Sequence, residues 1–331
     1  MDHDQFNIRF NNVDQIKAKI TGVGGALGSK LVNNEHLITN LDTTDTWIQT
    51  RTGIKQRYFV SNEGLTDLAF QALSNALDQA NMQAENIDVI IVATTTSDNA
   101  FPSCAVRLHG LFNMKSTCLA FDVGAACNGF IYGLKLAKMF LSQPNINHVA
   151  LIGADVMSRL IDLEDRTTAI LFGDGAGAVI LSATDENIGF LSEDFGADGT
   201  KYDLLYTTNK STNSTQQFIT MQGQEVFKDA VVQMSDSLKK SIAQAGLHLE
   251  DINLLIPHQA NIRIIEAIQN RLNMDANKII KTVSMHSNTS AASIPLALDY
   301  AKQIGKLDKN QYIAFCGMGA GLTWGSVVMK I

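Results

Sequence analysis

The sequence predicts an α/β protein built from two similar halves. The first observation is a pair of near-continuous apolar runs, Ile87–Thr95 and Ile252–Pro257, which are typical of strands buried on both faces. The second is a helical pattern before each run, Leu65–Ala84 and Glu225–Gly246. The third is their spacing, because the starts of the two runs are separated by half the length of the chain. A duplicated α/β unit explains the length and the alternation together.

Other short segments repeat at nearly the same half-chain offset. Val149–Gly153 (VALIG) resembles Ile313–Gly317 (IAFCG) in the second half. Ala126-Cys127, which open a helical stretch, resemble Ala291-Ala292, which open another at the corresponding place. These matches support the duplication, although βαβ units resemble one another in any case.

We therefore expect two halves, residues 1–184 and 185–331, each of a usual domain size. Ligands favour domain interfaces and the carboxyl ends of parallel strands. A site between the two halves is accordingly predicted.

Composition excludes several classes of function. The net charge of −7 disfavours a nucleic-acid partner, and any acidic partner would need a local basic patch. Residues 1–10 lack a secretory signal, and no apolar stretch approaches the roughly 18–20 residues that span a bilayer, so no membrane insertion is expected. The spacing of the four cysteines fits no zinc or redox pattern, which favours the reducing cytoplasm.

Cys127 is the first candidate for catalysis. An extended run, Leu119–Val123, meets small residues and then a helical apolar pattern, which places the thiol at a strand-to-helix turn. The N-terminus of a helix favours a thiolate, and its N–H groups can hold an oxyanion. The alternative is a small buried hydrophobic residue, as most unpaired cysteines are. Cys104, Cys118 and Cys316 lack this context and are interpreted as core.

His258 and Asn288 are the next candidates. His258 lies in PHQAN, directly after a buried strand and before the helical stretch Ile262–Leu272, where α/β enzymes place catalytic groups. Asn288 lies in HSNTSAASIP, where small polar residues lead into a helix. A structural histidine and a helix-capping or turn asparagine remain the alternatives at this point.

Two glycine-rich stretches have several interpretations. Gly317–Gly325 could cradle a phosphate, supply an oxyanion N–H or form a tight turn. Gly22–Gly28 resembles a dinucleotide-binding loop but breaks the G-x-G-x-x-G register, because position 27 is leucine. We predict a strand-to-loop turn there and no nicotinamide.

Taken together, the motifs resemble the type III β-ketoacyl-(acyl-carrier-protein) synthases of the thiolase superfamily, from about Ile20 to the C-terminus. Residues 1–15 are additional to a typical member. The motifs, in family order, are WIQTRTG (47–53), AFPS (100–103), GAACNGF (124–130), FGDGAG (172–177), EVFK (225–228), PHQAN (257–261), NTSAAS (288–293) and GAGLTWG (319–325).

The resemblance implies the duplicated, five-layered αβαβα thiolase fold and a Cys–His–Asn set at Cys127, His258 and Asn288. It places the two oxyanion donors at the N–H groups of Cys127 and Ala320. Ala320 stands where glycine is frequent, but only its backbone N–H is needed. Asn128 and Ser287 also differ from commoner small residues, a change that could alter the pocket but leaves the three catalytic positions intact.

The implied activity is acyl transfer. An acyl-CoA primer, with acetyl-CoA favoured, condenses with malonyl-acyl-carrier protein under loss of CO₂, which starts fatty acid synthesis. No metal and no cofactor are expected, since acyl-CoA is a substrate, and the resemblance implies a homodimer. The implied further positions are Trp47, Arg51 and Arg166 for CoA, Lys228 and Arg263 for carrier-protein docking, and Phe101, Phe172 and Met221 for the acyl pocket. Solvated charges, a half-buried tryptophan and core packing are the plainer interpretations of these residues.

Three rival functions remain. A degradative thiolase would use a second cysteine, for which Cys316 and a histidine at His286 are the candidates, but PHQAN with NTSAAS favours the decarboxylating type. A relative from secondary metabolism could use the same acyl-cysteine. A catalytically inactive scaffold would be expected to lack part of the set, and all three residues are present.

Overall fold

The computed structural model describes residues 16–39, 41–207 and 218–331. The additional segment, residues 1–15, lies outside them. Within these ranges no helix is both long and apolar enough to cross a membrane.

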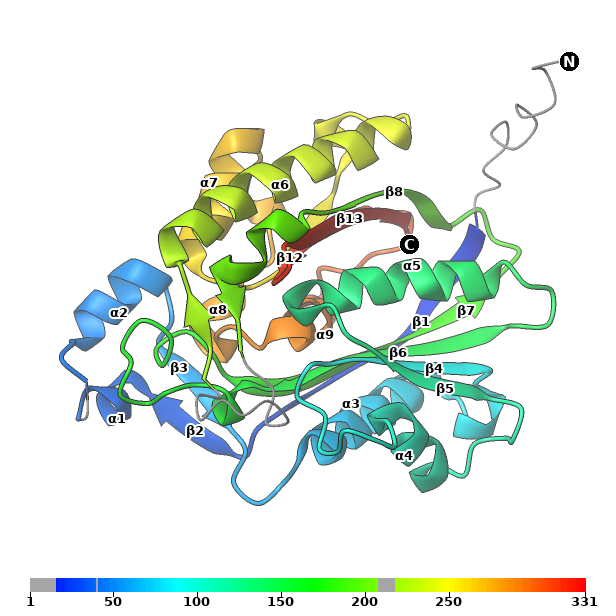
Figure 1. Cartoon of the computed structure of the whole chain (residues 1–331). Helices are drawn as coiled ribbons and strands as arrows, with labels where there is room; N and C mark the ends of the chain where they lie inside the picture. Colours follow the sequence, from blue (N-terminus) through cyan, green and yellow to red (C-terminus); the bar gives the residue numbers. More distant parts are fainter. Residues whose placement is uncertain (1–15, 40, 208–217) are drawn as a thin grey trace, which may run out of the picture.

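The elements of the first half are β1 (Ile16–Leu27), β2 (Lys30–Asn33), α1 (Asn34–Ile38), α2 (Asp45–Thr52), β3 (Gln56–Phe59), α3 (Leu65–Ala80), β4 (Val89–Ala93), α4 (Cys104–Leu111), β5 (Leu119–Val123), α5 (Gly129–Leu141), β6 (His148–Val156) and β7 (Asp174–Ala183). Those of the second half are β8 (Gly189–Ala197), β9 (Leu205–Tyr206), β10 (Thr220–Met221), α6 (Gly223–Gln244), β11 (Leu254–Pro257), α7 (Ile262–Leu272), α8 (Val283–His286), α9 (Ser293–Gln303), β12 (Tyr312–Gly319) and β13 (Thr323–Lys330). Figure 1 shows α3 and α4 of the first half on the opposite side of the molecule from α6 and α7 of the second half.

The strand pairing repeats between the halves. β4 runs parallel to β6, which is antiparallel to β7, and β11 runs parallel to β12, which is antiparallel to β13. The complete order is β11-β12-β13-β8-β1-β7-β6-β4-β5, with β1 joining the halves through its antiparallel pairs with β7 and β8. The two apolar runs are β4 and β11, as predicted. The proposed division at residue 184 lies between β7 and β8 and stays a prediction.

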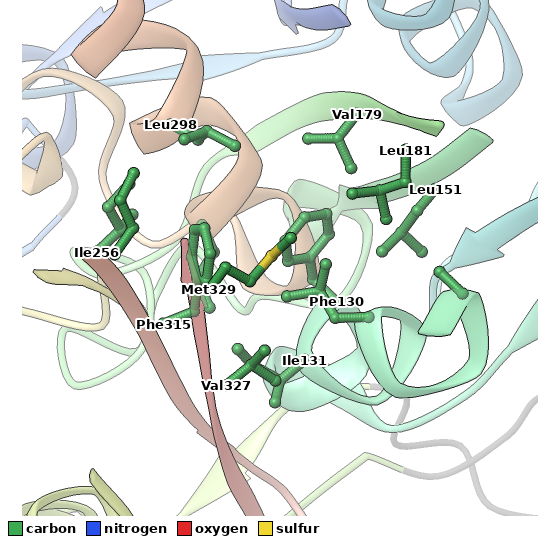
Figure 2. Packing of buried hydrophobic residues seen from close by; sticks show 14 of the residues in the cluster. Phe130, Ile131, Leu151, Val179, Leu181, Ile256, Leu298, Phe315, Val327 and Met329 are labelled. Carbon is green, nitrogen blue, oxygen red and sulfur yellow. The ribbon is translucent and has the colours of Figure 1, made fainter. Parts of the chain in front are cut away.

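Alternating side chains separate the molecule into five layers. In β6, Leu151 faces the central core around α5 and α9, whereas Ile152 faces the outer core against α3 and α4. In β12, Phe315 faces the central core and Cys316 the outer core of α6 and α7. Figure 2 shows side chains of both halves meeting in this central core. Because successive side chains of a strand point to opposite faces of the sheet, each of these strands packs against one helical layer on either side. The five-layered αβαβα fold is confirmed.

The predicted turn at Gly22–Gly28 is wrong. Gly22, Gly24 and Gly25 belong to β1, which continues to Leu27, and of these glycines only Gly28 lies beyond the strand. A Cβ at Gly22 would lie 2.1 Å from the Ala76 carbonyl oxygen, and one at Gly24 would lie 2.4 Å from that of Ala72. The glycines therefore allow the backbone of α3 to pack directly on the strand.

Candidate active site

Cys127 lies at the predicted strand-to-helix turn. β5 ends at Val123, and a single 3₁₀ turn, Ala126–Asn128, leads directly into α5. Ala126 has a positive φ of 46°, an uncommon conformation for a residue with a side chain. The sharp turn places the cysteine immediately before the first turn of the helix.

The second half contains the matching turn. Ser290–Ala292 form a 3₁₀ turn that leads into α9, and Ser290 has a φ of 52°. Ser290 follows Ala126 at the half-chain offset seen in the sequence. The two turns contact each other at the centre of the molecule. The duplication therefore brings the nucleophile turn of one half against the turn that follows Asn288 in the other.

A pocket of about 270 Å³ opens onto Cys127. Its walls are largely apolar, and Ala320 from the turn between β12 and β13 is among them. Phe172, predicted as a pocket wall, lies in the lining, whereas Met221 packs in neighbouring hydrophobic clusters and does not line this pocket. The lining residues are Thr95, Ala126, Cys127, Met157, Leu160, Phe172, Tyr202, Leu205, Tyr206, Thr207, Ile219, Ser290, Ala320 and Gly321.

His258 and Asn288 are held by the segment that follows Asn288. Nδ1 of His258 lies 2.6 Å from Oγ of Ser293, and the backbone N–H of Ser290 donates to Oδ1 of Asn288 over 2.9 Å. A side-chain hydrogen bond also joins Ser290 to Cys127. All three predicted catalytic residues therefore lie within one hydrogen bond of residues 290–293, although His258 and Asn288 are not in the pocket lining itself.

The environment keeps the imidazole neutral. Burial lowers the pKa of His258 to about 4, so one ring nitrogen carries a proton and the other a lone pair at neutral pH. Oδ1 of Asn288 is already occupied as an acceptor, which leaves its NH₂ group to donate elsewhere. The pair can thus offer two neutral hydrogen-bond donors.

The predicted resting thiolate is wrong. Burial raises the pKa of Cys127 to about 12, and the charge of Asp155 acts in the same direction, while the hydrogen bond with Ser290 opposes the shift. Desolvation of the sulfur is the largest of these effects. Cys127 therefore rests as the thiol.

Asp155 is a part of the site that the sequence interpretation missed. This carboxylate is fully buried on β6, and burial raises its pKa. Its Oδ1 accepts from the backbone N–H of Thr95 at 2.9 Å and the hydroxyl of Thr96 at 2.8 Å, and its Oδ2 accepts from the N–H of Ala291 at 3.2 Å. Asp155 thus ties the loop after β4 to the turn at Ser290. A carboxylate in the otherwise apolar run HVALIGADV was the available signal.

The three predicted CoA-binding residues lie together outside the pocket. The guanidinium carbons of Arg51 and Arg166 lie 5.7 and 5.1 Å from the ring centroid of Trp47. Trp47 is half-buried, and both arginines are exposed. The cluster offers an aromatic face and two cations to a ligand at the surface.

The predicted docking residues lie on neighbouring helices. Arg263 of α7 lies over the ring of Phe227 on α6, at 5.5 Å, and Lys228 is the next residue of α6. Lys228 pairs with Glu225 at 2.8 Å, and Asp229 lies beside it. The surface is therefore of mixed charge, which differs from the local basic patch that was anticipated.

Cys316 does not have the position that a thiolase mechanism would require. Its side chain is fully buried in the outer core with α6 and α7, away from the described pocket lining. His286 is half-buried, and desolvation lowers its pKa to about 4. Cys104 and Cys118 pack in the outer core of the first half, as predicted.

The chain is similar to a known family over most of its length. Residues 121–199 and 242–331 match the family models for 3-oxoacyl-[acyl-carrier-protein (ACP)] synthase III and its C-terminal part. A beta-ketoacyl-[acyl-carrier-protein] synthase III of Rickettsia prowazekii is 43% identical over 314 residues, covering 94% of this chain and 99% of that protein.

Solved structures agree with the sequence comparison. The 3-oxoacyl-[acyl-carrier-protein] synthase III from Aquifex aeolicus superposes with a TM-score of 0.91 at 40% identity, covering 95% of this chain and all of that one. A priming beta-ketosynthase from the R1128 polyketide biosynthetic pathway reaches a TM-score of 0.90 at 29% identity, covering 97% and 98% of the two chains.

Proposed function

The chain belongs to the 3-oxoacyl-[acyl-carrier-protein] synthase III family, and from this premise we propose that it condenses an acyl-CoA primer with malonyl-acyl-carrier protein. CO₂ is lost, 3-oxoacyl-acyl-carrier protein is formed, and fatty acid synthesis begins. Acetyl-CoA is the proposed primer. The observation that carries this proposal is the Cys127 thiol at the pocket wall, beside a segment that also holds His258 and Asn288.

In the first step, sulfur of Cys127 attacks the thioester carbonyl of acyl-CoA. The N–H groups of Cys127 and Ala320 stabilise the oxyanion. The C–S bond to Cys127 forms first and gives this tetrahedral oxyanion; its collapse then breaks the bond to the CoA sulfur, which leaves with the thiol proton. Because Cys127 rests as the thiol, this proton transfer belongs to the step itself. An acyl-cysteine and free CoA result.

In the second step, the bond between the malonyl carboxylate and its α-carbon breaks, and CO₂ leaves. The electron pair moves onto the thioester oxygen as an enolate, which accepts hydrogen bonds from His258 and the Asn288 NH₂. The enolate carbon then attacks the acyl-cysteine, a C–C bond forms, and Cys127 leaves and takes up one proton from solvent. Thiol, imidazole and amide carry out this sequence, so we propose that no cofactor is needed.

The surface residues fit substrates that arrive on a phosphopantetheine arm. Trp47, Arg51 and Arg166 offer stacking and positive charge to the nucleotide of CoA. Lys228 and Arg263 lie exposed on two adjacent helices, where we propose that the acidic carrier protein docks.

We further propose a homodimer formed along β5. This strand lies at one end of the sheet, and exposed apolar side chains surround it: Leu119 on the strand itself, and Val106 and Leu111 on α4. Phe101 is 85% exposed, as expected for a side chain that enters the pocket of a neighbouring subunit.

Leu119→Asp should shift the protein from dimer to monomer in sedimentation velocity, whereas Val232→Asp on α6 should not. A monomeric wild-type protein would refute the dimer.

The test of the function is acylation followed by condensation. Mixing with acetyl-CoA should add one acetyl group to Cys127 by intact-mass spectrometry, and the adduct should disappear in Cys127→Ser. Cys104→Ser is the matched control, because burial raises the Cys104 pKa to about 12 as well, yet Cys104 lies outside this pocket. Absence of an adduct with any short acyl-CoA would favour an inactive scaffold.

A relative of secondary metabolism is the second candidate, since the priming ketosynthase of a polyketide pathway shares the fold at 29% identity. A chain-length series of acyl-CoA primers, with malonyl-acyl-carrier protein as acceptor, discriminates between them. Condensation of acetyl-CoA supports the proposal, and rejection of malonyl-acyl-carrier protein with every primer would overturn it. The four unpaired cysteines are consistent with the proposed cytoplasmic location.

A further inference from the structure

The neutral imidazole of His258 can hold its proton on either ring nitrogen, and the choice decides what it can do. A proton on Nε2 makes that atom a hydrogen-bond donor, whereas a proton on Nδ1 makes Nε2 an acceptor. Stabilising an enolate oxygen requires the donor. The partner of Nδ1 therefore determines whether His258 suits the condensation step.

That partner is Ser293, the first residue of α9. Its Oγ lies 2.6 Å from Nδ1 of His258, and both side chains are almost fully buried, at 2% and 3% exposure. The short distance and the burial make this contact a fixed part of the site rather than a surface contact.

A second hydrogen bond favours one direction for the first. The backbone N–H of Gln259 donates to Oγ of Ser293 over 3.3 Å. The hydroxyl proton of Ser293 then needs an acceptor, and Nδ1 of His258 is the acceptor that the described residues supply. With Nδ1 on His258 occupied as an acceptor, the ring proton is on Nε2.

Gln259 is itself held rigidly. Its amide NH₂ donates to the carbonyl oxygens of Pro257 at 2.7 Å and Ile280 at 3.1 Å, and its Oε1 accepts from the N–H of Thr282 at 2.8 Å. The side chain is fully buried. These three bonds hold Gln259 in place, and with it the backbone N–H that donates to Oγ of Ser293.

We propose that Ser293 is a positioning residue that fixes the Nε2–H tautomer of His258 and so makes the imidazole a hydrogen-bond donor in the condensation step. The inference rests on the proposed function, because the donor is needed only if an enolate forms. Ser293 is not among the described residues that line the pocket, and we propose that it acts through the ring. It should consequently affect condensation more than the acylation of Cys127.

The main test compares Ser293→Ala with Ser293→Thr. Loss of one hydrogen bond to a buried group corresponds to about a tenfold effect, so Ser293→Ala should lower kcat for condensation about tenfold. KM for malonyl-acyl-carrier protein and the rate of Cys127 acylation should change little. Ser293→Thr, which retains the hydroxyl, should restore most of the rate. Ser237→Ala is the matched control, because Ser237 is equally buried on α6 but contacts none of the proposed catalytic residues.

A spectroscopic readout tests the tautomer without activity. In ¹⁵N-histidine-labelled wild-type protein, with the His258 signals assigned by their loss in His258→Asn, Nε2 should appear protonated and Nδ1 unprotonated. Ser293→Ala should show a mixture of the two tautomers. A wild-type spectrum with the proton on Nδ1, or unchanged condensation in Ser293→Ala, would overturn the inference. If Ser293→Ala fails to fold, the inference is still tested by the tautomer in the wild-type spectrum and by the condensation rate of Ser293→Thr.

These outcomes are distinct from failure of the proposed function. A wild-type protein that does not use malonyl-acyl-carrier protein would refute the function. The tautomer of His258 would still be read directly from the wild-type spectrum.

Discussion

Gly319→Ala is expected to disable the oxyanion hole while leaving the fold in place. Gly319 is the last residue of β12, directly behind the nucleophile turn. A Cβ at this position would lie 2.7 Å from the carbonyl oxygen of Ala125, 2.8 Å from the backbone nitrogen of Asn128 and 3.1 Å from that of Cys127. All three contacts are backbone atoms, so no side chain can rotate away to relieve them.

The size of the effect follows from these distances. An ordinary carbon contact begins near 3.4 Å, so the turn must move by about 0.3 to 0.7 Å (3.4 − 3.1 and 3.4 − 2.7). An oxyanion donor acts over about 2.7–3.1 Å, and its removal costs about 10²–10³ in rate. We expect a loss of this order in the acylation of Cys127, with an overpacking penalty of about 1–3 kcal/mol in stability.

Two assays separate the oxyanion hole from the sulfur. Single-turnover acylation by acetyl-CoA requires the hole, whereas alkylation by iodoacetamide forms no oxyanion and should fall much less. Gly199→Ala is the control, because a Cβ there meets nothing within 4 Å. Wild-type acylation in a folded Gly319→Ala protein would refute the reasoning, and so would an equal loss in both assays.

Three further predictions concern the thiol, the buried carboxylate and the CoA surface. Because burial raises the pKa of Cys127 to about 12, its alkylation rate should rise about tenfold per pH unit between pH 6 and 9; a plateau near pH 7 would contradict this. Asp155→Asn places an NH₂ group against N–H or O–H donors, so the urea midpoint should fall by an amount equivalent to about 1–3 kcal/mol; an unchanged midpoint would argue against ionised Asp155. Arg166→Ala removes a guanidinium that we propose to stack on the nucleotide of CoA beside Trp47. Such a cation–π contact contributes about 0.5–2 kcal/mol, so KM for acetyl-CoA should rise roughly 2- to 30-fold while KM for acetyl-pantetheine stays constant.

Local patterns predicted much of the site. The run before Cys127 predicted a strand-to-helix turn, and the structure confirms it. This prediction was possible because the strand pattern, the small residues and the helical pattern are all formed by residues that are close together in the sequence. The half-chain offset between similar segments predicted a duplicated unit, and the paired 3₁₀ turns at Cys127 and Ser290 lie at the centre of the confirmed fold.

Other features depend on contacts between distant segments. The glycines of β1 were interpreted as a turn because their purpose, the close approach of α3, involves a helix that comes much later in the chain. The acidity of Cys127 was misjudged because a helix N-terminus is visible in sequence, whereas desolvation depends on what surrounds the sulfur.

The sequence by itself determined which side chains are available for chemistry and the order in which strands and helices follow one another, because these depend on residue type and local periodicity. Only the tertiary structure decided that Asp155 joins the two halves and that Ser293 contacts Nδ1 of His258. These two bonds join residues that are separated by 136 and 35 positions in the sequence, and they form because of how the layers pack on one another. The periodicity of strands and helices predicts which face of an element is buried, but not which other element packs against it.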